Sequence, residues 1–224
     1  MKRAIDVACS LVALLLLSPL LTAIVLILSV TGEREIFYVQ TRVGRWRRNF
    51  GVLKFATMLK DSPQMGTGYV TMKDDPRVLP VGRWLRATKI NELPQLVNVL
   101  RGEMSLVGPR PQSERCFAAF SEAAQKEISK VKPGLTGLGS LVFRDEETLL
   151  GTDTDTIFYD HVVAPYKGDL EIWYVSNQSL WLDLKIIMST VLLICLPSSP
   201  VSITTFGDLP VPPAELEHLV DIKS

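Results

Sequence analysis

A carboxylate and a set of basic side chains could together carry out phosphoryl chemistry in this chain. Glu92 directly follows Asn91 and precedes a Leu-Pro-Gln run. If Asn91 caps a helix, Glu92 lies at its positive end, where free backbone N–H groups favour a carboxylate or a phosphate. Arg110 stands between two prolines in a stiff backbone, and a guanidinium binds phosphate through two parallel hydrogen bonds. These residues predict a site for a phosphorylated substrate.

The stretch from Lys89 to Pro111 must position these groups. Its apolar residues recur at helical spacing and predict one buried helix face, made of Leu93, Leu96, Val97 and Leu100. Pro94 is tolerated in a first turn, and Gly102 stands where such a helix would end. A capped core helix followed by a turn explains the same pattern without any chemistry, and for an isolated helix it is the more common explanation.

The first thirty residues are apolar enough to enter a membrane. From Ala4 to Val30 the only charge is Asp6, and about 20 apolar residues are enough to span a bilayer as a helix. However, an interior proline removes a backbone hydrogen bond, and basic residues on both flanks favour the cytoplasmic side for both ends. A helix that is broken at Ser18-Pro19, and that enters and leaves by one leaflet, satisfies both features. A proline-kinked spanning helix is the alternative.

Charge and cysteine content narrow the class of protein. Lys and Arg total 24, as do Asp and Glu, but residues 1–60 hold nine basic against three acidic residues. Residues 140–184 hold two basic against nine acidic residues. We interpret the acidic cluster that begins at Asp145 and includes Asp153, Asp155 and Asp160 as a solvated loop in preference to a magnesium site. The three scattered cysteines predict neither a disulfide framework nor a zinc site, and they fit a reducing compartment. No nucleic-acid motif is visible.

Residues 36–58 predict a β-hairpin around Gly44, with strands at Ile36–Gln40 and Phe50–Phe55. The tip combines an aromatic ring with three guanidinium groups: Arg45, Trp46, Arg47 and Arg48. Such a tip suits anionic lipid headgroups, at about 1 kcal/mol per basic residue near the surface. A solvated hairpin tip is the plainer alternative.

The remaining segments are interpreted as packing elements. Arg77 and Arg83 are expected on a solvated basic face. One amphipathic helix is predicted from Pro111 to about Lys130, with a buried face made of Phe117, Phe120, Ala124 and Ile128. Residues 132–137 predict a tight loop, whose glycines permit close backbone approach to a ligand and are equally explained by turn geometry.

A last helix is predicted over the apolar run that ends before Pro197. Its broad apolar face consists of Leu180, Trp181, Leu184, Ile187, Met188, Val191 and Cys195. The run is too short to span a membrane comfortably, so we expect it to lie at the membrane interface or in the core.

Several motifs, in order along the chain, resemble those of the bacterial sugar transferases, the monotopic polyprenyl-phosphate phosphoglycosyl transferases. The resemblance runs from Lys2 to about Leu196 and includes the Ser-Pro break, the run after Asn91, and the segment MSLVGPRP that ends at Pro111. The family usually carries aspartate at the position of Asn91 and arginine at the position of Ala56.

The resemblance implies a fold, namely a mainly helical α+β protein. Residues 1–32 would form the re-entrant membrane helix, and residues 33–198 a phosphoglycosyl transferase catalytic domain with interfacial amphipathic helices and a short β-hairpin. Residues 199–224 would form an irregular C-terminal tail.

The resemblance also implies a reaction. A sugar phosphate would move from a UDP-sugar to a polyprenyl phosphate such as undecaprenyl phosphate, with assistance from Mg²⁺. The enzyme would work among phospholipids at the cytoplasmic face of the bacterial inner (plasma) membrane, in the first membrane step of glycoconjugate assembly.

Roles for individual residues follow from the same resemblance. Asn91 and Glu92 occupy the catalytic positions, and Glu92 would also hold the metal. The cations that would bind phosphate are Lys54, Arg86, Arg110 and Arg144. We expect the carboxylate and these cations to share one pocket level with the lipid headgroups.

Asn91 leaves the mechanism open, because a neutral carboxamide is a far poorer nucleophile than the carboxylate that the family uses. Glu92 could attack the phosphorus instead, or the acceptor phosphate could attack the donor directly. In a third account the chain is an inactive form that still binds its substrates. It would then serve as a membrane scaffold for a glycan-assembly complex.

Overall fold

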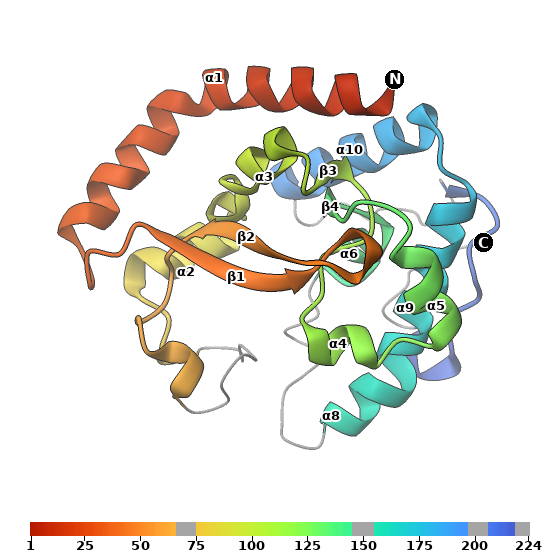
Figure 1. The fold of residues 1–224 in the computed structure, drawn as a ribbon. Coiled ribbons are helices and arrows are strands. Elements are labelled where there is room, and N and C mark those ends of the chain that lie inside the picture. The colour runs from red at the N-terminus through yellow and green to blue at the C-terminus, as the bar shows by residue number, and fades with distance from the viewer. Residues whose placement is uncertain (66–74, 145–154, 197–205, 218–224) are drawn as a thin grey trace. The chain divides into compact units, whose positions relative to one another are not determined.

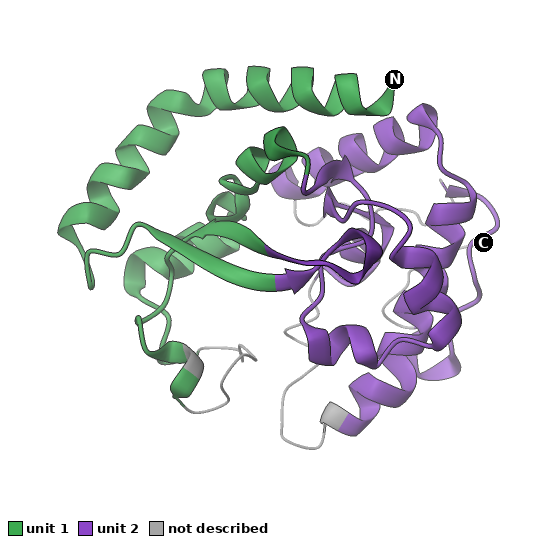
Figure 2. Ribbon diagram, in the orientation of Figure 1, with its two compact units in different colours: residues 1–41, 51–102 green, residues 42–50, 103–224 purple. Residues whose placement is uncertain are grey.

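The computed structural model describes residues 1–65, 75–144, 155–196 and 206–217, and it separates into two compact units (Figure 1, Figure 2). Unit 1 consists of residues 1–41 and 51–102, and unit 2 consists of residues 42–50 and 103–224. The described residues form mainly helices together with two small sheets of two strands each. The prediction of a mainly helical α+β fold is therefore confirmed, and the domain boundaries at residues 32 and 198 stay predictions.

Unit 1 begins with the long helix α1 (Lys2–Val30), in which most apolar side chains are exposed. Among the described residues, it is the one helix that is long and apolar enough to cross a membrane. The helix continues through Pro19 and bends partway along its length (Figure 1). An interior proline is a common cause of such a bend. The predicted break at Ser18-Pro19 thus corresponds to a proline inside a continuous, bent helix.

The start of α1 is fastened to helix α3 (Gln95–Arg101). The guanidinium of Arg3 donates hydrogen bonds to the carbonyl oxygens of Val99 and Leu100. These carbonyls lie in the last turn of α3, where backbone oxygens lack the regular partner four residues on and favour a positive charge. One basic residue before the apolar segment therefore ties the membrane element to the globular part of unit 1.

Two strands form the predicted hairpin, and both are longer than predicted. Strand β1 (Phe37–Val43) pairs with strand β2 (Asn49–Phe55). The connecting turn η1 (Arg45–Arg47) contains two residues with positive φ, Trp46 at 59° and Arg47 at 56°. Because residues with a side chain seldom adopt this conformation, the turn stores backbone strain.

Helix α2 (Pro80–Ala87) and the short helices η2 (Ser62–Gln64) and η3 (Ile90–Glu92) complete unit 1 with α3. Helix α3 ends at Gly102, whose φ of 85° is the left-handed conformation expected there. The prediction that Asn91 caps this helix is wrong, since the cap is Pro94 and Asn91 lies in η3. A proline has no N–H to donate, so it fits at a helix start and separates the two turns.

The buried face of α3 also differs from the predicted one. Leu96 is buried as expected, whereas Leu93, Val97 and Leu100 are only half-buried. The other buried residues are Gln95, Asn98 and Val99. Helix α3 contacts α1 and also bonds to β2, so neighbours cover more than one of its faces.

Unit 2 contains a parallel pair of short strands, β3 (Ser105–Val107) and β4 (Gly134–Thr136). Half of the predicted tight loop at residues 132–137 is thus strand β4. The sequence did not indicate this strand, because three residues are too few to show an alternating pattern. A Cβ at Gly134 would overlap the backbone nitrogen of Gly108, and a Cβ at Gly137 would overlap the carbonyl group of Gly108. These glycines allow two backbone segments to touch each other.

The single helix predicted after Pro111 is instead two helices, α4 (Glu114–Ala118) and α5 (Glu122–Ile128). The hydroxyls of Ser113 and Ser121 accept hydrogen bonds from backbone N–H groups in the first turn of each helix. Two good N-caps so close together start two helices. The four residues predicted to be buried are all buried.

The other described elements of unit 2 after β4 are helices. They comprise α6 (Leu138–Val142), α8 (Asp155–Phe158), the π-helical turn η4 (Tyr159–Val163), α9 (Ala164–Ser176), α10 (Leu180–Cys195) and η6 (Ala214–Leu216). Helix α10 confirms the predicted last helix. It packs on the core through Leu182, Ile186 and Leu193, while most of the predicted apolar face is exposed.

Helix α9 runs through the core of unit 2 and is linked to two neighbouring elements by Tyr174. The Tyr174 hydroxyl donates to Oδ1 of Asp183 on α10 at 2.7 Å, and it lies 3.2 Å from the carbonyl oxygen of Val107 on β3. Both side chains are buried. This link fixes the strand that leads to Arg110.

The contact between glycine backbones predicts that Gly134→Ala will severely destabilise the protein. The added methyl group would displace the Gly108 backbone, and we expect the free energy of unfolding to fall by about 3 kcal/mol. Chemical denaturation of the chain in detergent micelles measures this. Gly51→Ala is the control, because its Cβ would meet only the end of the Val39 side chain, which can rotate away. Equal losses in the two variants would contradict the interpretation.

Candidate active site

Glu92 and Lys54 form an ion pair within unit 1. Oε1 of Glu92 in η3 lies 3.5 Å from Nζ of Lys54 on β2. Only 14% of the Glu92 side chain and 19% of the Lys54 side chain are exposed, so the pair is partly removed from water. Two residues predicted for the site, far apart in the sequence, are thus brought together.

Asn98 holds the strand that carries Lys54, and sequence reasoning missed this residue. The backbone N–H of Leu53 donates to Oδ1 of Asn98 at 2.9 Å, and Nδ2 of Asn98 donates to the carbonyl oxygen of Gly51 at 2.7 Å. The side chain is completely buried. It satisfies one N–H and one carbonyl of β2, as the backbone of a neighbouring strand would. The signal in the sequence was an amide inside an otherwise apolar helical stretch, where a buried polar group needs partners.

Asn91 is buried beside Glu92, with 7% of its surface exposed. Its carboxamide oxygen has no hydrogen-bond partner among the described residues. An unpaired buried carbonyl costs stability, about 1–3 kcal/mol for a neutral group. The position at which the resemblance implies a catalytic residue thus holds an uncharged, enclosed oxygen.

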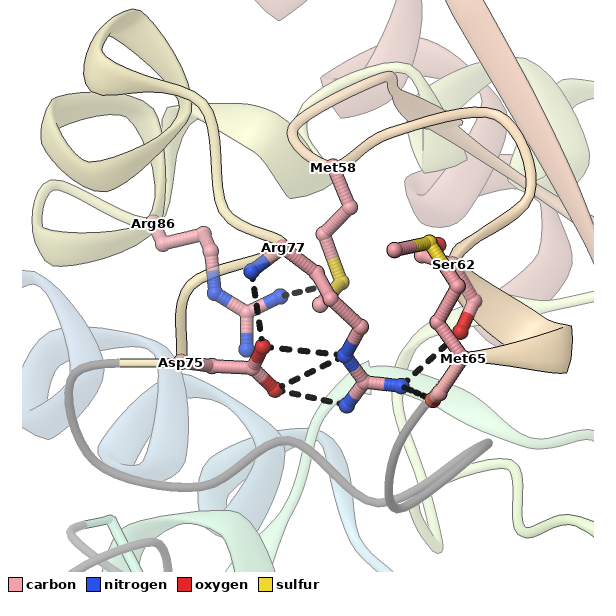
Figure 3. A network of polar contacts seen from close by, with 6 residues as sticks. All are labelled: Met58, Ser62, Met65, Asp75, Arg77 and Arg86. Carbon is pink, nitrogen blue, oxygen red and sulfur yellow. Dashed lines mark hydrogen bonds and ion pairs between the residues drawn. The ribbon is translucent and has the colours of Figure 1, made fainter.

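Arg86 is the second predicted cation in unit 1. It lies on α2, which packs against η3, the turn that holds Asn91 and Glu92. The guanidinium nitrogen Nη1 lies 4.0 Å from the sulfur of Met58, and the residue is half-buried (Figure 3). Packing therefore places Arg86 next to the turn that holds Glu92.

Arg77 is buried, so the prediction that it lies on a solvated face is wrong. It donates to both carboxylate oxygens of Asp75 and to the carbonyl oxygens of Ser62 and Met65 (Figure 3). The hydrogen bonds to Asp75 raise the pKa of Arg77 above its ordinary value. Arg83 is exposed, as predicted. Spacing alone does not distinguish a surface arginine from one that organises a loop.

Arg110 and Arg144 lie in unit 2. Arg110 directly follows the glycine contact, where Gly108 N–H donates to the Thr136 carbonyl at 3.0 Å and Gly134 N–H donates to the Pro109 carbonyl at 2.8 Å. Arg144 comes just after helix α6, and both arginines are half-buried. The prediction that all four cations and Glu92 share one pocket stays a prediction.

A buried charged pair on α9, Lys167 and Glu171, lies in unit 2 and was not predicted. Burial raises the pKa of Glu171 to about 7, whereas Lys167 and the backbone N–H groups of Arg110 and Gly139 lower it. The spacing of i and i+4 was the available signal, although it is far more common on exposed helix faces.

The described residues contain no group of three or more His, Cys, Asp or Glu side chains placed to hold a metal ion. The acidic residues 145–154 lie outside the described part of the chain. Magnesium is often bound by one or two carboxylates together with substrate phosphates. The half-buried carboxylate of Glu92 fits that mode, and the predicted role for Mg²⁺ stays a prediction.

Comparisons of the chain with a family model and with individual proteins point to the same family. The model of the family described as bacterial sugar transferase matches residues 1–196. The chain is 38% identical over 195 residues to an undecaprenyl-phosphate glucose phosphotransferase of Komagataeibacter xylinus, a match that covers 85% of the chain and 35% of that protein. It is 32% identical over 192 residues to the UDP-N-acetylgalactosamine-undecaprenyl-phosphate N-acetylgalactosaminephosphotransferase of Aeromonas hydrophila, with 85% and 42% covered.

A shorter relative matches over most of its length. The exopolysaccharide production protein ExoY of Sinorhizobium fredii is 35% identical over 209 residues, which cover 87% of this chain and 85% of that protein. The chain therefore spans less than half of the two phosphotransferases above and most of this third relative.

The contacts of Asn98 predict that Asn98→Leu will destabilise unit 1 and displace Lys54. The change leaves the half-buried Leu53 N–H and Gly51 carbonyl without this partner, which should cost about 1–2 kcal/mol. Thermal unfolding in detergent measures the loss. Asn177→Leu removes an exposed asparagine with a single hydrogen bond, and it should change stability by less than about 0.5 kcal/mol. A similar loss in both variants would show that β2 does not depend on Asn98.

Proposed function

This chain belongs to the bacterial sugar transferase family, and we propose that it moves a sugar phosphate from a UDP-sugar to a polyprenyl phosphate such as undecaprenyl phosphate. The observation that carries the proposal is the half-buried ion pair of Glu92 and Lys54, which lies within motifs of that family. The reaction would begin the assembly of a polysaccharide or another glycoconjugate on the membrane.

The charges of the site suit this reaction. A diphosphate donor and a lipid phosphate are both anionic, so their approach needs fixed positive charge. Lys54, Arg86, Arg110 and Arg144 would supply it. Glu92 would hold Mg²⁺, which neutralises the diphosphate when it is bound.

The buried carboxamide of Asn91 limits the possible nucleophiles. Because its oxygen is uncharged and enclosed, two routes fit the site: the acceptor phosphate attacks the β-phosphorus of the donor directly, or Glu92 attacks first. In the second route, a bond forms between a Glu92 oxygen and the phosphorus as uridine monophosphate leaves. The acceptor phosphate then displaces the Glu92 carboxylate from the sugar phosphate.

A membrane scaffold is the second candidate function, and Asn91 is the observation that favours it. Ala56 adds little to this alternative, since it is 94% buried and its position packs in the core of unit 1. In the scaffold proposal the protein binds the donor and the lipid without turnover.

Release of uridine monophosphate from UDP-sugars, in membranes that contain polyprenyl phosphate, tests the proposed reaction. We expect the wild type to release it from at least one UDP-sugar, and Glu92→Gln and Arg110→Ala to lower the rate about 100-fold or more. Arg83→Ala is the control, because Arg83 is an exposed arginine on the same helix as Arg86. Wild-type turnover in Glu92→Gln and Arg110→Ala would refute the assigned roles. A wild type that binds donor without release would establish the scaffold.

Trapping a labelled sugar phosphate on the active protein distinguishes the two routes. Label that maps to Glu92 supports the covalent route, and turnover without any bound label supports direct attack.

We also propose that α1 is re-entrant and that the protein works at the cytoplasmic face of the bacterial inner membrane. Exposed apolar side chains along α1 support its burial in lipid, and the bend supports return to the same side (Figure 1). The hairpin tip would contact phospholipid headgroups. Its Trp46 is 57% exposed, and the Trp46 ring lies 4.8 Å from the Arg45 guanidinium.

Cysteine labelling in oriented membrane vesicles tests the topology. Lys2→Cys and Gln40→Cys, each made in a variant whose three native cysteines are replaced by serine, lie on either side of α1. We expect an impermeant reagent to label both positions from the cytoplasmic side only. Labels that react from opposite sides would show that α1 spans the bilayer.

A further inference from the structure

The interior of unit 2 contains a carboxylate that packing alone does not explain. Glu171 on α9 is 1% exposed, and Lys167, one helical turn earlier, is 2% exposed. Both oxygens of the Glu171 carboxylate lack a hydrogen bond of good geometry to any described residue. A leucine or methionine would fill the same volume without the cost of removing a charge from water.

The surroundings of this carboxylate are specific. The backbone N–H groups of Arg110 and Gly139 are close enough to lower its pKa, although burial raises that pKa more strongly. A Cβ on Gly139 would lie 2.5 Å from Oε1 of Glu171, so only a glycine lets the backbone approach the carboxylate this closely. The side-chain nitrogen of Lys167 lies 5.6 Å from the centre of the Phe143 ring.

These contacts fall on the two segments that carry the unit 2 arginines. One N–H belongs to Arg110 itself. The other belongs to Gly139, in the first turn of α6, and Arg144 follows the end of that helix. Phe143, which Lys167 faces, directly precedes Arg144. The pair on α9 therefore faces the backbone of Arg110, the first turn of α6 and the ring of Phe143, which precedes Arg144.

We propose that Glu171, supported by Lys167, is a positioning residue that fixes Arg110 and the α6 segment so that Arg110 and Arg144 present their guanidinium groups to the phosphates of the donor. The proposal rests on the proposed function, because only phosphate binding gives these arginines a common task. The negative carboxylate attracts both N–H dipoles, although neither makes a hydrogen bond of good geometry with it. This attraction favours the close approach of the Gly139 backbone to Oε1, and it acts on two segments about 30 residues apart in sequence.

Glu171→Gln tests the proposal with almost no change of shape. The amide keeps one acceptor oxygen and turns an NH₂ group toward an N–H donor, so one of the two contacts is lost. We expect the KM for the UDP-sugar to rise about tenfold, as for loss of one hydrogen bond to a charged group, with a much smaller change in kcat. Asp169→Asn is the matched control, since it makes the same chemical change on an exposed residue of α9, and it should leave both constants unchanged.

A double-mutant cycle separates positioning from general loss of structure. If Glu171 acts through Arg110, Glu171→Gln should raise KM much less in an Arg110→Lys background than in the wild type. Glu171→Asp, which keeps the charge, should recover part of the loss. Additive effects in the cycle, or a KM for Glu171→Gln equal to that for Asp169→Asn, would overturn the proposal.

Hydrogen exchange gives a result that does not depend on turnover. We expect Glu171→Gln to speed amide exchange at Gly108, at Arg110 and in residues 137–144, and Asp169→Asn to leave it unchanged. Unchanged exchange in both variants would refute the positioning role even in a chain without activity. A wild type that releases no uridine monophosphate would instead contradict the proposed function, so the two failures are distinct.

Discussion

The attraction between Glu92 and Lys54 is the interaction on which the candidate active site depends. At 3.5 Å and with both side chains mostly buried, the charges are screened less by water than an exposed pair would be. In the proposed reaction, a phosphate of the donor would draw on Lys54 while a cation would draw on Glu92. The scaffold around the pair must hold two opposite charges near each other without closing them into a tight bridge.

Polar side chains supply that scaffold where regular secondary structure is short. Asn98 hydrogen-bonds to the backbone of β2. Arg77 donates hydrogen bonds to two loop carbonyl groups and to the carboxylate of Asp75. In unit 2, Tyr174 links α9 to α10 and β3. Each of these side chains is buried and bonded to partners distant in sequence. Removing one of them leaves unpaired groups in the core, so the site depends on buried polar residues as much as on apolar packing.

The sequence was sufficient for features that leave a local signal. The apolar content of α1, the glycine that ends α3 and the β-rich runs of the hairpin each depend on a few neighbouring residues, and each was predicted. The start of α3, strand β4 and the burial of Arg77 were not. These depend on contacts with distant segments: Gly134 needs Gly108, and Arg77 needs the carbonyl of Ser62. Asn98 and Glu171 are similar cases, because a polar residue within an apolar stretch does not indicate which backbone it will meet.

Asn91 is best understood from its surroundings. An aspartate with its oxygen in the same enclosed position would carry a full charge without a described partner, and burying such a charge costs far more than burying an amide. Asparagine keeps the shape of aspartate and removes that cost, so it relieves electrostatic strain at this position. The same change leaves Glu92 as the carboxylate of this turn, with a cation beside it and part of its surface open. Any chemistry that this turn retains must therefore pass through Glu92 or through the substrates themselves.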